Sequence, residues 1–150
     1  MSLVDSIAPG LDGLAQMRAL LAGNKKPGIL VSLQLDLAEV EPGRVTFTGI
    51  PGEHAYNPIG SVHGGYAATL LDSACGCAVH TRLTALQAYT TLELKVNYLK
   101  GITKESGLLR AEGRAIQVGR RAAFAEASIT DAAGKVYATA SSTLLIFERA

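Results

Sequence analysis

The sequence predicts an α+β protein in which an antiparallel sheet wraps around one long central helix. A helix is expected at about residues 64–82, and its residues 65–79 are apolar or small on every face apart from one acid, which is typical of a buried helix. Two segments with strand-like patterns precede this helix, and four more follow it in succession. A parallel sheet would need a crossover helix after most of its strands, so four successive strands favour antiparallel pairing.

Before the central helix, the pattern predicts one short helix and two strands. Residues 10–22 carry Leu and Met side chains at helical spacing and are followed by Gly23, which stops the helix. Residues 29–37 alternate, with aliphatic side chains on one face, and residues 44–50 form the second strand. A Glu-Pro-Gly sequence at residues 41–43 predicts the turn between these strands.

After a loop at residues 51–62 and the central helix, the pattern becomes that of strands. Residues 92–98 alternate between apolar and polar side chains, as in a half-buried antiparallel strand. Its apolar face would consist of Leu92, Leu94, Val96 and Tyr98. Three more strands are expected at residues 108–118, 121–130 and 135–147, with turns at 118–120 and 131–134.

The composition fits one ordinary folded domain. The chain has 150 residues, 48% of them hydrophobic and 18% charged, enough to bury a core without disulfide or metal support. No internal repeat or linker divides it, so we expect one domain over residues 1–150 with its core at 29–148. The net charge of +1 and the lack of a basic stripe argue against nucleic acid as a partner.

Nothing in the sequence predicts export or a membrane span. The first residues lack the positive and apolar regions of a secretory signal. The longest weakly polar stretch, residues 64–81, holds an acid at its middle, which argues against membrane insertion. Cys75 and Cys77 lie too close together for ordinary disulfide geometry, and there is no other cysteine. We therefore expect a cytoplasmic protein.

Asp72 is the only residue of the central helix before His80 that is charged at neutral pH. An unpaired buried carboxylate destabilises a small domain by roughly several kcal/mol. Two interpretations of Asp72 are open at this point. Its carboxylate could cap a neighbouring backbone segment or pair with an arginine, or it could be retained for chemistry.

Polar and glycine residues lie just before this helix, namely Asn57, His63, Gly64 and Gly65. The first turn of a helix has N–H groups without intrahelical partners, and the helix dipole favours negative charge there. Glycines let a ligand carbonyl approach the backbone closely. Gly64 and Gly65 are therefore candidate substrate contacts, and a developing thioester oxyanion is the kind of charge that such a site stabilises.

Taken together, these segments read Asn57, five residues, His63-Gly64-Gly65, six residues, and Asp72. This spacing resembles the signature of hotdog-fold acyl-CoA thioesterases of the phenylacetic-acid-degradation (PaaI-type) family. In that family the sequence His-Gly-Gly is followed by an acid at this distance on the central helix. The resemblance implies a hotdog fold, an acyl-CoA substrate, hydrolysis to a free acid and CoA, and no cofactor.

The resemblance also implies roles for individual residues. Asp72 matches the catalytic acid, which acts as nucleophile or general base. Gly64 matches the residue whose backbone N–H faces the thioester carbonyl. Asn57 matches a side chain that orients substrate or water, and His63 matches a motif histidine that is more structural than catalytic. Thr91 falls where some members carry a hydroxyl near the acid.

Helix geometry adds a prediction about assembly. Gly64 and Asp72 are eight residues apart, so they lie about 12 Å apart along one helix. A carbonyl within hydrogen-bonding distance of the Gly64 N–H cannot also meet Asp72 of the same helix. Either the two residues serve different sites, or two subunits share each site across a two-fold dimer. The resemblance implies such dimers, and it implies that two dimers assemble into a homotetramer.

The turn containing Gly119, Arg120 and Arg121 is a candidate for binding the phosphates of coenzyme A. Lys100, which follows the strand at residues 92–98, is a second candidate. Exposed arginines at a hairpin are also ordinary solvated side chains, so both interpretations stay open.

Other chemistries find less support. Cys77 and His80 are three residues apart, but a cysteine in a buried helix is usually inert. His54, His63 and His80 lack the spacing of zinc ligands, and neither a serine-hydrolase elbow nor a glycine-rich nucleotide loop is present.

Two further functions remain as alternatives, a hotdog hydratase or dehydratase and a non-catalytic acyl-CoA-binding protein. A hydratase would be expected to place a catalytic histidine on the helix or the loop at a different spacing.

For an acyl group of aryl or medium-chain type, we expect pocket walls from small and apolar residues such as Leu71, Cys75 and Leu83.

Overall fold

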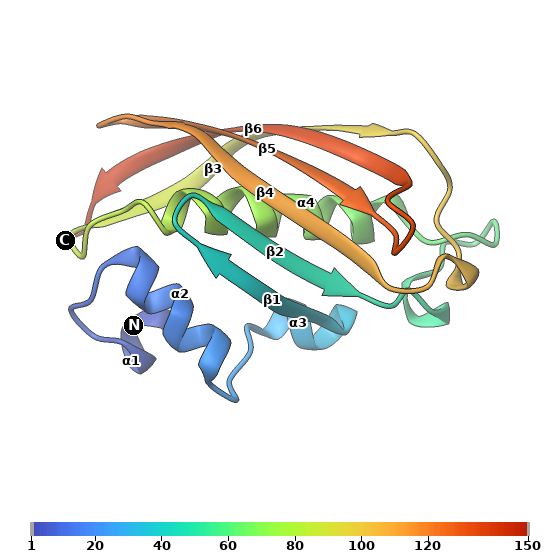
Figure 1. The fold of residues 1–150 in the computed structure, drawn as a ribbon, viewed down its shortest axis with the longest axis horizontal. Helices are drawn as coiled ribbons and strands as arrows, with labels where there is room; N and C mark the ends of the chain where they lie inside the picture. Colours follow the sequence, from blue (N-terminus) through green and yellow to red (C-terminus); the bar gives the residue numbers. More distant parts are fainter. Residues whose placement is uncertain (1, 150) are drawn as a thin grey trace.

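The structure is a computed structural model that describes residues 2–149. Within this range, a six-stranded sheet has the order β1-β2-β4-β5-β6-β3, and every neighbouring pair is antiparallel. Three short helices come before the sheet and one long helix lies against it (Figure 1). The elements are α1 (Leu3–Ile7), α2 (Gly13–Ala22), α3 (Gly28–Leu33), β1 (Leu35–Glu41), β2 (Arg44–Gly49), η1 (Glu53–Ala55), α4 (Gly64–His80), β3 (Gln87–Tyr98), η2 (Lys104–Ser106), β4 (Leu109–Val118), β5 (Ala122–Thr130) and β6 (Val136–Glu148).

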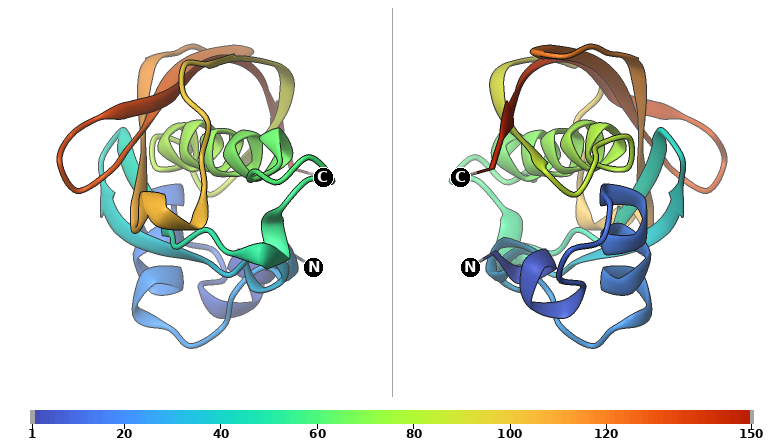
Figure 2. Two further views of the ribbon diagram at one scale, coloured as in Figure 1. Left: turned by 90° about the vertical axis from the view of Figure 1, so that its right-hand side faces the viewer. Right: turned by 90° about the vertical axis from the view of Figure 1, so that its left-hand side faces the viewer.

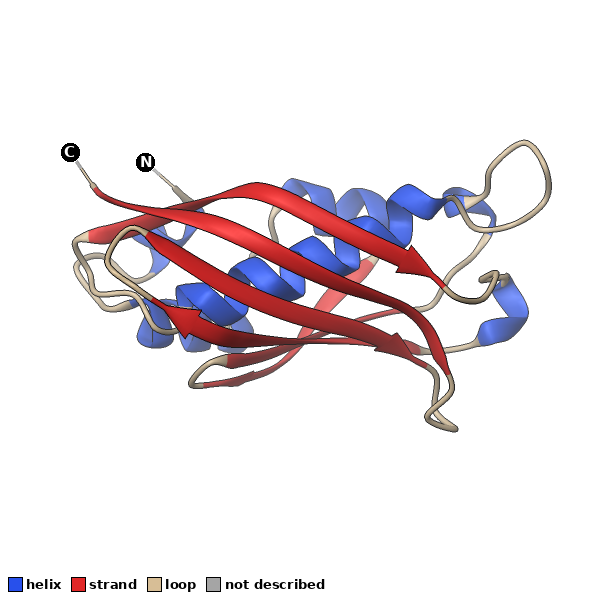
Figure 3. Ribbon diagram, turned by 90° about the horizontal axis from the view of Figure 1, so that it is seen from above, coloured by secondary structure: helices blue, strands red, loops and turns tan. Residues whose placement is uncertain are grey.

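The long helix α4 runs along the concave face of the curved sheet, which wraps around it when viewed end-on (Figure 2). Its sheet-facing side is built largely from Ala, Leu and Cys side chains, which are fully buried. Close approach is possible because β4 has a glycine where the helix passes. A Cβ atom on Gly113 would lie only 2.2 Å from the carbonyl oxygen of Ala74. The small residues therefore allow α4 to pack closely against the sheet. Figure 3 shows the helix lying across the strands on one face of the sheet.

The other side of α4 is not covered within residues 2–149. Asp72, Ser73 and Cys77 are partly exposed there, and Gly65 is exposed. These positions follow helical spacing and define one stripe along the helix. The prediction that every face of the helix is buried is therefore wrong for the single chain, because the sheet covers only one face. Asp72 is only partly buried.

The prediction of a strand at residues 29–37 is wrong in its first half. Pro27 caps a short helix, α3, which ends at Gln34 in a left-handed conformation with φ 56°. The strand β1 begins only at Leu35. An alternating apolar pattern in so short a segment does not separate a strand from a helix, and Val31, one of the alternating aliphatic residues, is 61% exposed.

Strand β3 is longer than predicted and carries a bulge. The pairing register with β6 shifts between Thr91 and Glu93. Leu94 and Val96 pack against the core as expected, but Leu92 at the bulge and Tyr98 are 60% and 56% exposed. A bulge inserts one residue and interrupts the alternation of faces, which the sequence pattern does not reveal. Strand β3 forms one edge of the sheet.

The remaining boundaries agree closely with the predictions, apart from α1, which was not predicted. Helix α2 matches the expected helix at residues 10–22 and begins after Asp12, whose side chain accepts a hydrogen bond from the Ala15 N–H. An ion pair between Asp5 and Arg149 joins the first helix to the end of β6.

An antiparallel sheet wrapped around one long central helix is the hotdog fold, so the predicted fold class is confirmed. None of the helices within residues 2–149 is long and apolar enough to cross a membrane.

Candidate active site

Asp72 lies on the uncovered stripe of α4, opposite β3. The Thr91 hydroxyl donates a hydrogen bond of 3.0 Å to Asp72 Oδ1. Among residues 2–149, Asp72 has no ion pair with Lys or Arg and accepts no backbone N–H. The interpretation that Asp72 caps a neighbouring backbone segment or pairs with an arginine is therefore wrong within the described chain. Its second oxygen, Oδ2, has no partner there.

A cleft of about 470 Å³ opens beside Asp72 and Thr91. Its walls come from three parts of the chain, namely the N-terminal helices, the sheet and α4. They are mostly apolar, and Asp72 is the only charged side chain among them. The other lining residues are Leu20, Pro27, Ile29, Leu30, Phe47, Ser73, Cys77, Tyr89 and Thr90.

The expected pocket walls Leu71, Cys75 and Leu83 are not in this cleft. Their side chains belong to the core, with exposed fractions of 0%, 0% and 3%. Leu71 and Cys75 lie on the sheet-facing side of α4, away from the uncovered stripe. The N-terminal walls were missed because only tertiary packing brings α2 and α3 beside α4.

Cys77 and His80 do not form a nucleophile pair. Burial raises the pKa of the Cys77 thiol to about 12, and a hydrogen bond with Tyr89 only partly offsets that effect. His80 Nε2 lies 2.9 Å from Gln16 Oε1, and burial lowers the pKa of its imidazole. The thiol is therefore protonated at neutral pH, and the imidazole is engaged elsewhere.

At the start of α4, the motif histidine caps the helix. His63 Nδ1 accepts a hydrogen bond of 2.8 Å from the Gly65 N–H, so that donor is already used. The Gly64 N–H has no acceptor within residues 2–149. The Tyr98 hydroxyl donates to the Gly64 carbonyl oxygen at 2.9 Å and holds this turn in place. Gly64 therefore presents the free N–H that an oxyanion would need.

A second cavity, of about 480 Å³, contains this helix start. His63, Gly64, Gly65 and Lys100 line it together with apolar neighbours. Asp72 does not line this cavity, and Gly64 does not line the cleft beside Asp72. Within one chain, the two halves of the predicted catalytic site therefore face separate spaces.

Asn57 organises the loop that leads to α4. Its Nδ2 donates to Ser61 Oγ at 3.0 Å, and its Oδ1 accepts from the backbone N–H groups of Ile59 and Ser61 at 3.1 Å each. It lines neither of the two cavities. The structure thus does not bring Asn57 together with Asp72 in one chain.

The predicted phosphate-binding residues lie at opposite ends of the sheet. Lys100 lines the Gly64 cavity, and a hydrogen bond and charge repulsion from Lys135 lower the pKa of its ammonium group. Arg120 and Arg121, which follow Gly119, line a separate groove near the start of β3. Lys135 was not predicted, because the two lysines become neighbours only through folding.

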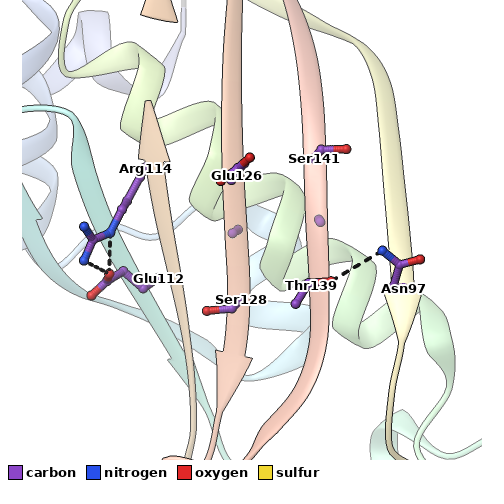
Figure 4. Close-up of a pocket in the computed structure, with 9 residues that line it drawn as sticks. Asn97, Glu112, Arg114, Glu126, Ser128, Thr139 and Ser141 are labelled. Carbon is purple, nitrogen blue, oxygen red and sulfur yellow. Dashed lines mark hydrogen bonds and ion pairs between the residues drawn. The ribbon is translucent and has the colours of Figure 1, made fainter. Parts of the chain in front are cut away.

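The outer face of the sheet carries a polar groove of about 400 Å³ (Figure 4). Arg114 pairs with Glu112 at 2.8 Å, and Arg44 pairs with the same carboxylate at 2.9 Å. Burial raises the pKa of Glu112, but the two guanidinium groups outweigh it and the net shift is downward. The described residues contain no cluster of His, Cys, Asp and Glu suited to a metal ion. This face therefore has the character of a solvated, ion-paired surface.

A carboxylate held by a threonine over an apolar cleft, on a fold whose central helix begins with a free N–H, is a site suited to acyl transfer. The sequence matches the family described as the thioesterase superfamily over residues 59–138, just over half of the chain. The chain belongs to this superfamily. It is a thioester hydrolase, and its resemblance to hotdog thioesterases of the PaaI type is confirmed.

Three individual proteins illustrate the similarity. A 1,4-dihydroxy-2-naphthoyl-CoA hydrolase from Listeria monocytogenes is 24% identical over 119 residues, covering 79% of this chain and 95% of its own. A Streptococcus mutans protein with bound acetyl CoA is 27% identical, with a TM-score of 0.69 and coverage of 77% and 90%. A phenylacetic-acid-degradation-related protein from Ralstonia eutropha is 25% identical, with a TM-score of 0.76 and coverage of 86% and 98%.

Proposed function

We propose that the protein hydrolyses an acyl-CoA thioester to a free acid and CoA, with Asp72 as the catalytic acid. The observation that carries this proposal is the position of Asp72 in the wall of an apolar cleft. One carboxylate oxygen is fixed by Thr91 and the other has no partner within residues 2–149. A carboxylate so held has a fixed direction and a free oxygen for chemistry.

Two chemical roles fit this arrangement. As a nucleophile, Asp72 would attack the thioester carbonyl and release CoA thiolate, and water would then hydrolyse the acyl–aspartyl intermediate. As a general base, Asp72 would take a proton from a water molecule that attacks the carbonyl directly. In both cases the C–S bond breaks, the oxygen from water ends in the free acid and a proton goes to the CoA thiolate.

We further propose that the oxyanion donor comes from a second copy of the chain. The Gly64 N–H has no acceptor within residues 2–149, yet it faces a different cavity from Asp72. Strand β3 is a sheet edge beside the uncovered stripe of α4. Antiparallel pairing of two β3 edges would bring the start of one α4 toward Asp72 of the other, in two sites related by symmetry.

The same arrangement would complete the coenzyme A site. Antiparallel β3 strands bring the beginning of one strand, near Arg120 and Arg121, toward the end of the other, near Lys100. The anionic phosphates of coenzyme A would then meet basic side chains from both copies. The structural relative with bound acetyl CoA supports this ligand.

A hydratase receives less support from the histidines. His63 Nδ1 accepts from Gly65, His80 Nε2 contacts Gln16 and His54 Nε2 lies 3.1 Å from the Leu33 carbonyl oxygen. Each imidazole is thus engaged in the structure of the chain. A non-catalytic binding protein has no need of the Asp72 carboxylate beside its ligand.

Release of free thiol from a panel of acyl-CoA thioesters tests the proposal. Asp72→Asn keeps the shape of the side chain and removes its charge, so we expect kcat to fall by about 100-fold or more. Glu126→Gln, on the outer face of the sheet, is the matched control and should keep parental activity. An Asp72→Asn protein with parental turnover of its best substrate would exclude Asp72 as the catalytic acid.

A further inference from the structure

We propose that the N-terminal segment selects the acyl group and that Ile29 of α3 is the residue that limits its size. This inference rests on the proposed function, because it takes the cleft beside Asp72 as the acyl site. It assigns a role in specificity to the short helices that come before the sheet. The substrate class that follows from this inference is an acyl-CoA whose acyl group is apolar and carries no carboxylate of its own.

The cleft itself supports an apolar occupant. Its volume of about 470 Å³ lies within the range of roughly 300–1,000 Å³ that is typical of small-molecule sites. Phe47 and Tyr89 form aromatic parts of the wall, and aliphatic side chains form most of the rest. The only charged lining residue is Asp72, so a negatively charged acyl end would meet repulsion and no compensating cation.

The N-terminal segment provides part of the wall of this cleft. Leu20 comes from α2, and Pro27, Ile29 and Leu30 come from α3 and its cap. Leu20 and Leu30 are buried at 9% and 4% exposure, so they anchor their helices. Ile29 is 53% exposed while lining the cleft, so its side chain is free to contact a ligand.

Several contacts fix the position of this wall. Pro27 begins α3, and the left-handed residue Gln34 ends it, with its N–H bonded to the carbonyl oxygens of Leu30 and Val31. The His54 ring contacts the Leu33 carbonyl oxygen at 3.1 Å and ties the helix to the loop before α4. A wall tied down at the C-terminal end of its helix restricts what can enter, since side chains on a fixed helix keep their positions.

The test measures selectivity rather than overall activity. We would compare kcat/KM for acetyl-, hexanoyl-, decanoyl- and succinyl-CoA in the parent and in Ile29→Trp and Ile29→Ala. The larger side chain should reduce the decanoyl-to-acetyl ratio about tenfold, and alanine should increase it, because a few methylene groups in an apolar pocket discriminate to about that extent. Succinyl-CoA should be hydrolysed at least tenfold less efficiently than hexanoyl-CoA by the parent.

Val31 provides the matched control. It lies two residues along the same helix, is 61% exposed and does not line the cleft. Val31→Trp and Val31→Ala should leave all ratios unchanged. Unchanged ratios in both Ile29 variants, with hydrolysis still dependent on Asp72, would overturn this inference alone. Failure of the parent to hydrolyse any acyl-CoA would instead overturn the proposed function.

Discussion

Replacing Gly64 by proline removes one proposed oxyanion donor while preserving the helix. Gly64 is the first residue of α4, the position at which proline is best tolerated, because its missing N–H is not needed there. The preceding residue must be extended for proline to fit, and His63 already has φ −61° and ψ 137°. The backbone before Gly64 therefore already has the conformation that a following proline requires.

Alanine at the same position is the matched control. A Cβ atom on Gly64 would lie 3.1 to 3.3 Å from three atoms of the Tyr98 side chain. Proline and alanine both add this close contact, and Tyr98 is 56% exposed and can move. Only proline removes the N–H. The difference between the two variants therefore isolates the donor from the steric change.

Loss of one oxyanion donor typically lowers kcat by about 100- to 1,000-fold. We expect this loss in Gly64→Pro relative to Gly64→Ala, measured by release of free thiol from the best acyl-CoA substrate. Equal rates in the two variants would refute the assignment of the Gly64 N–H as oxyanion donor.

Mixing Gly64→Pro with Asp72→Asn then tests the shared site. After complete subunit exchange, about half of the dimers carry one copy of each variant, and one of their two sites combines an intact Gly64 with an intact Asp72. The mixture should recover about a quarter of parental activity. A lack of recovery, with heterodimers demonstrated by mass spectrometry, would refute the two-subunit site.

Three further outcomes follow from the structure. The buried Tyr66 hydroxyl has no hydrogen-bond partner among the described residues, so Tyr66→Phe should raise the free energy of unfolding by about 1 kcal/mol in urea titrations, and a lower value would contradict this. Burial lowers the pKa of His80 below its ordinary value of 6.5, so the unfolded chain binds more protons as pH falls below that value. Stability should therefore be greatest above about pH 6.5 and decline toward pH 5.5, and the decline should be shallower in His80→Gln. Lys100→Ala should raise KM for full acyl-CoA with little change in kcat, whereas a substrate shortened to the pantetheine arm should show no difference. The same loss with both substrates would assign Lys100 another role.

The sequence predicted the parts of the fold that depend on long, regular patterns. Helix α4 and strands β4 to β6 are found within a few residues of their expected limits. The wrong predictions concern segments whose local sequence pattern fits two different backbone conformations. Residues 29–33 alternate like a strand but form α3, and the bulge at Leu92 reverses the faces of β3. Tertiary packing decides both cases.

The candidate site, like the fold, was predicted only in part. The spacing of the motif and the family resemblance indicated Asp72 and Thr91 as candidate site residues. In the structure the two side chains share a hydrogen bond. Their catalytic roles, the homotetramer and the cytoplasmic location stay predictions. The walls of the cleft could not be predicted, because Ile29 and Asp72 meet only after separate elements pack together. Lys100 and Lys135 likewise become neighbours only when the chain folds.

The bulge in β3 follows two consecutive threonines, and both Thr90 and Thr91 line the cleft. A slip of one position along a strand exchanges its inward and outward side chains. In most strands such a slip would replace a polar contact with an unrelated side chain. Here it would exchange one hydroxyl for another, so Asp72 could keep a threonine partner through a single-residue insertion or deletion. The tandem threonines would thus keep a hydroxyl beside the carboxylate of Asp72 in either register of the edge strand.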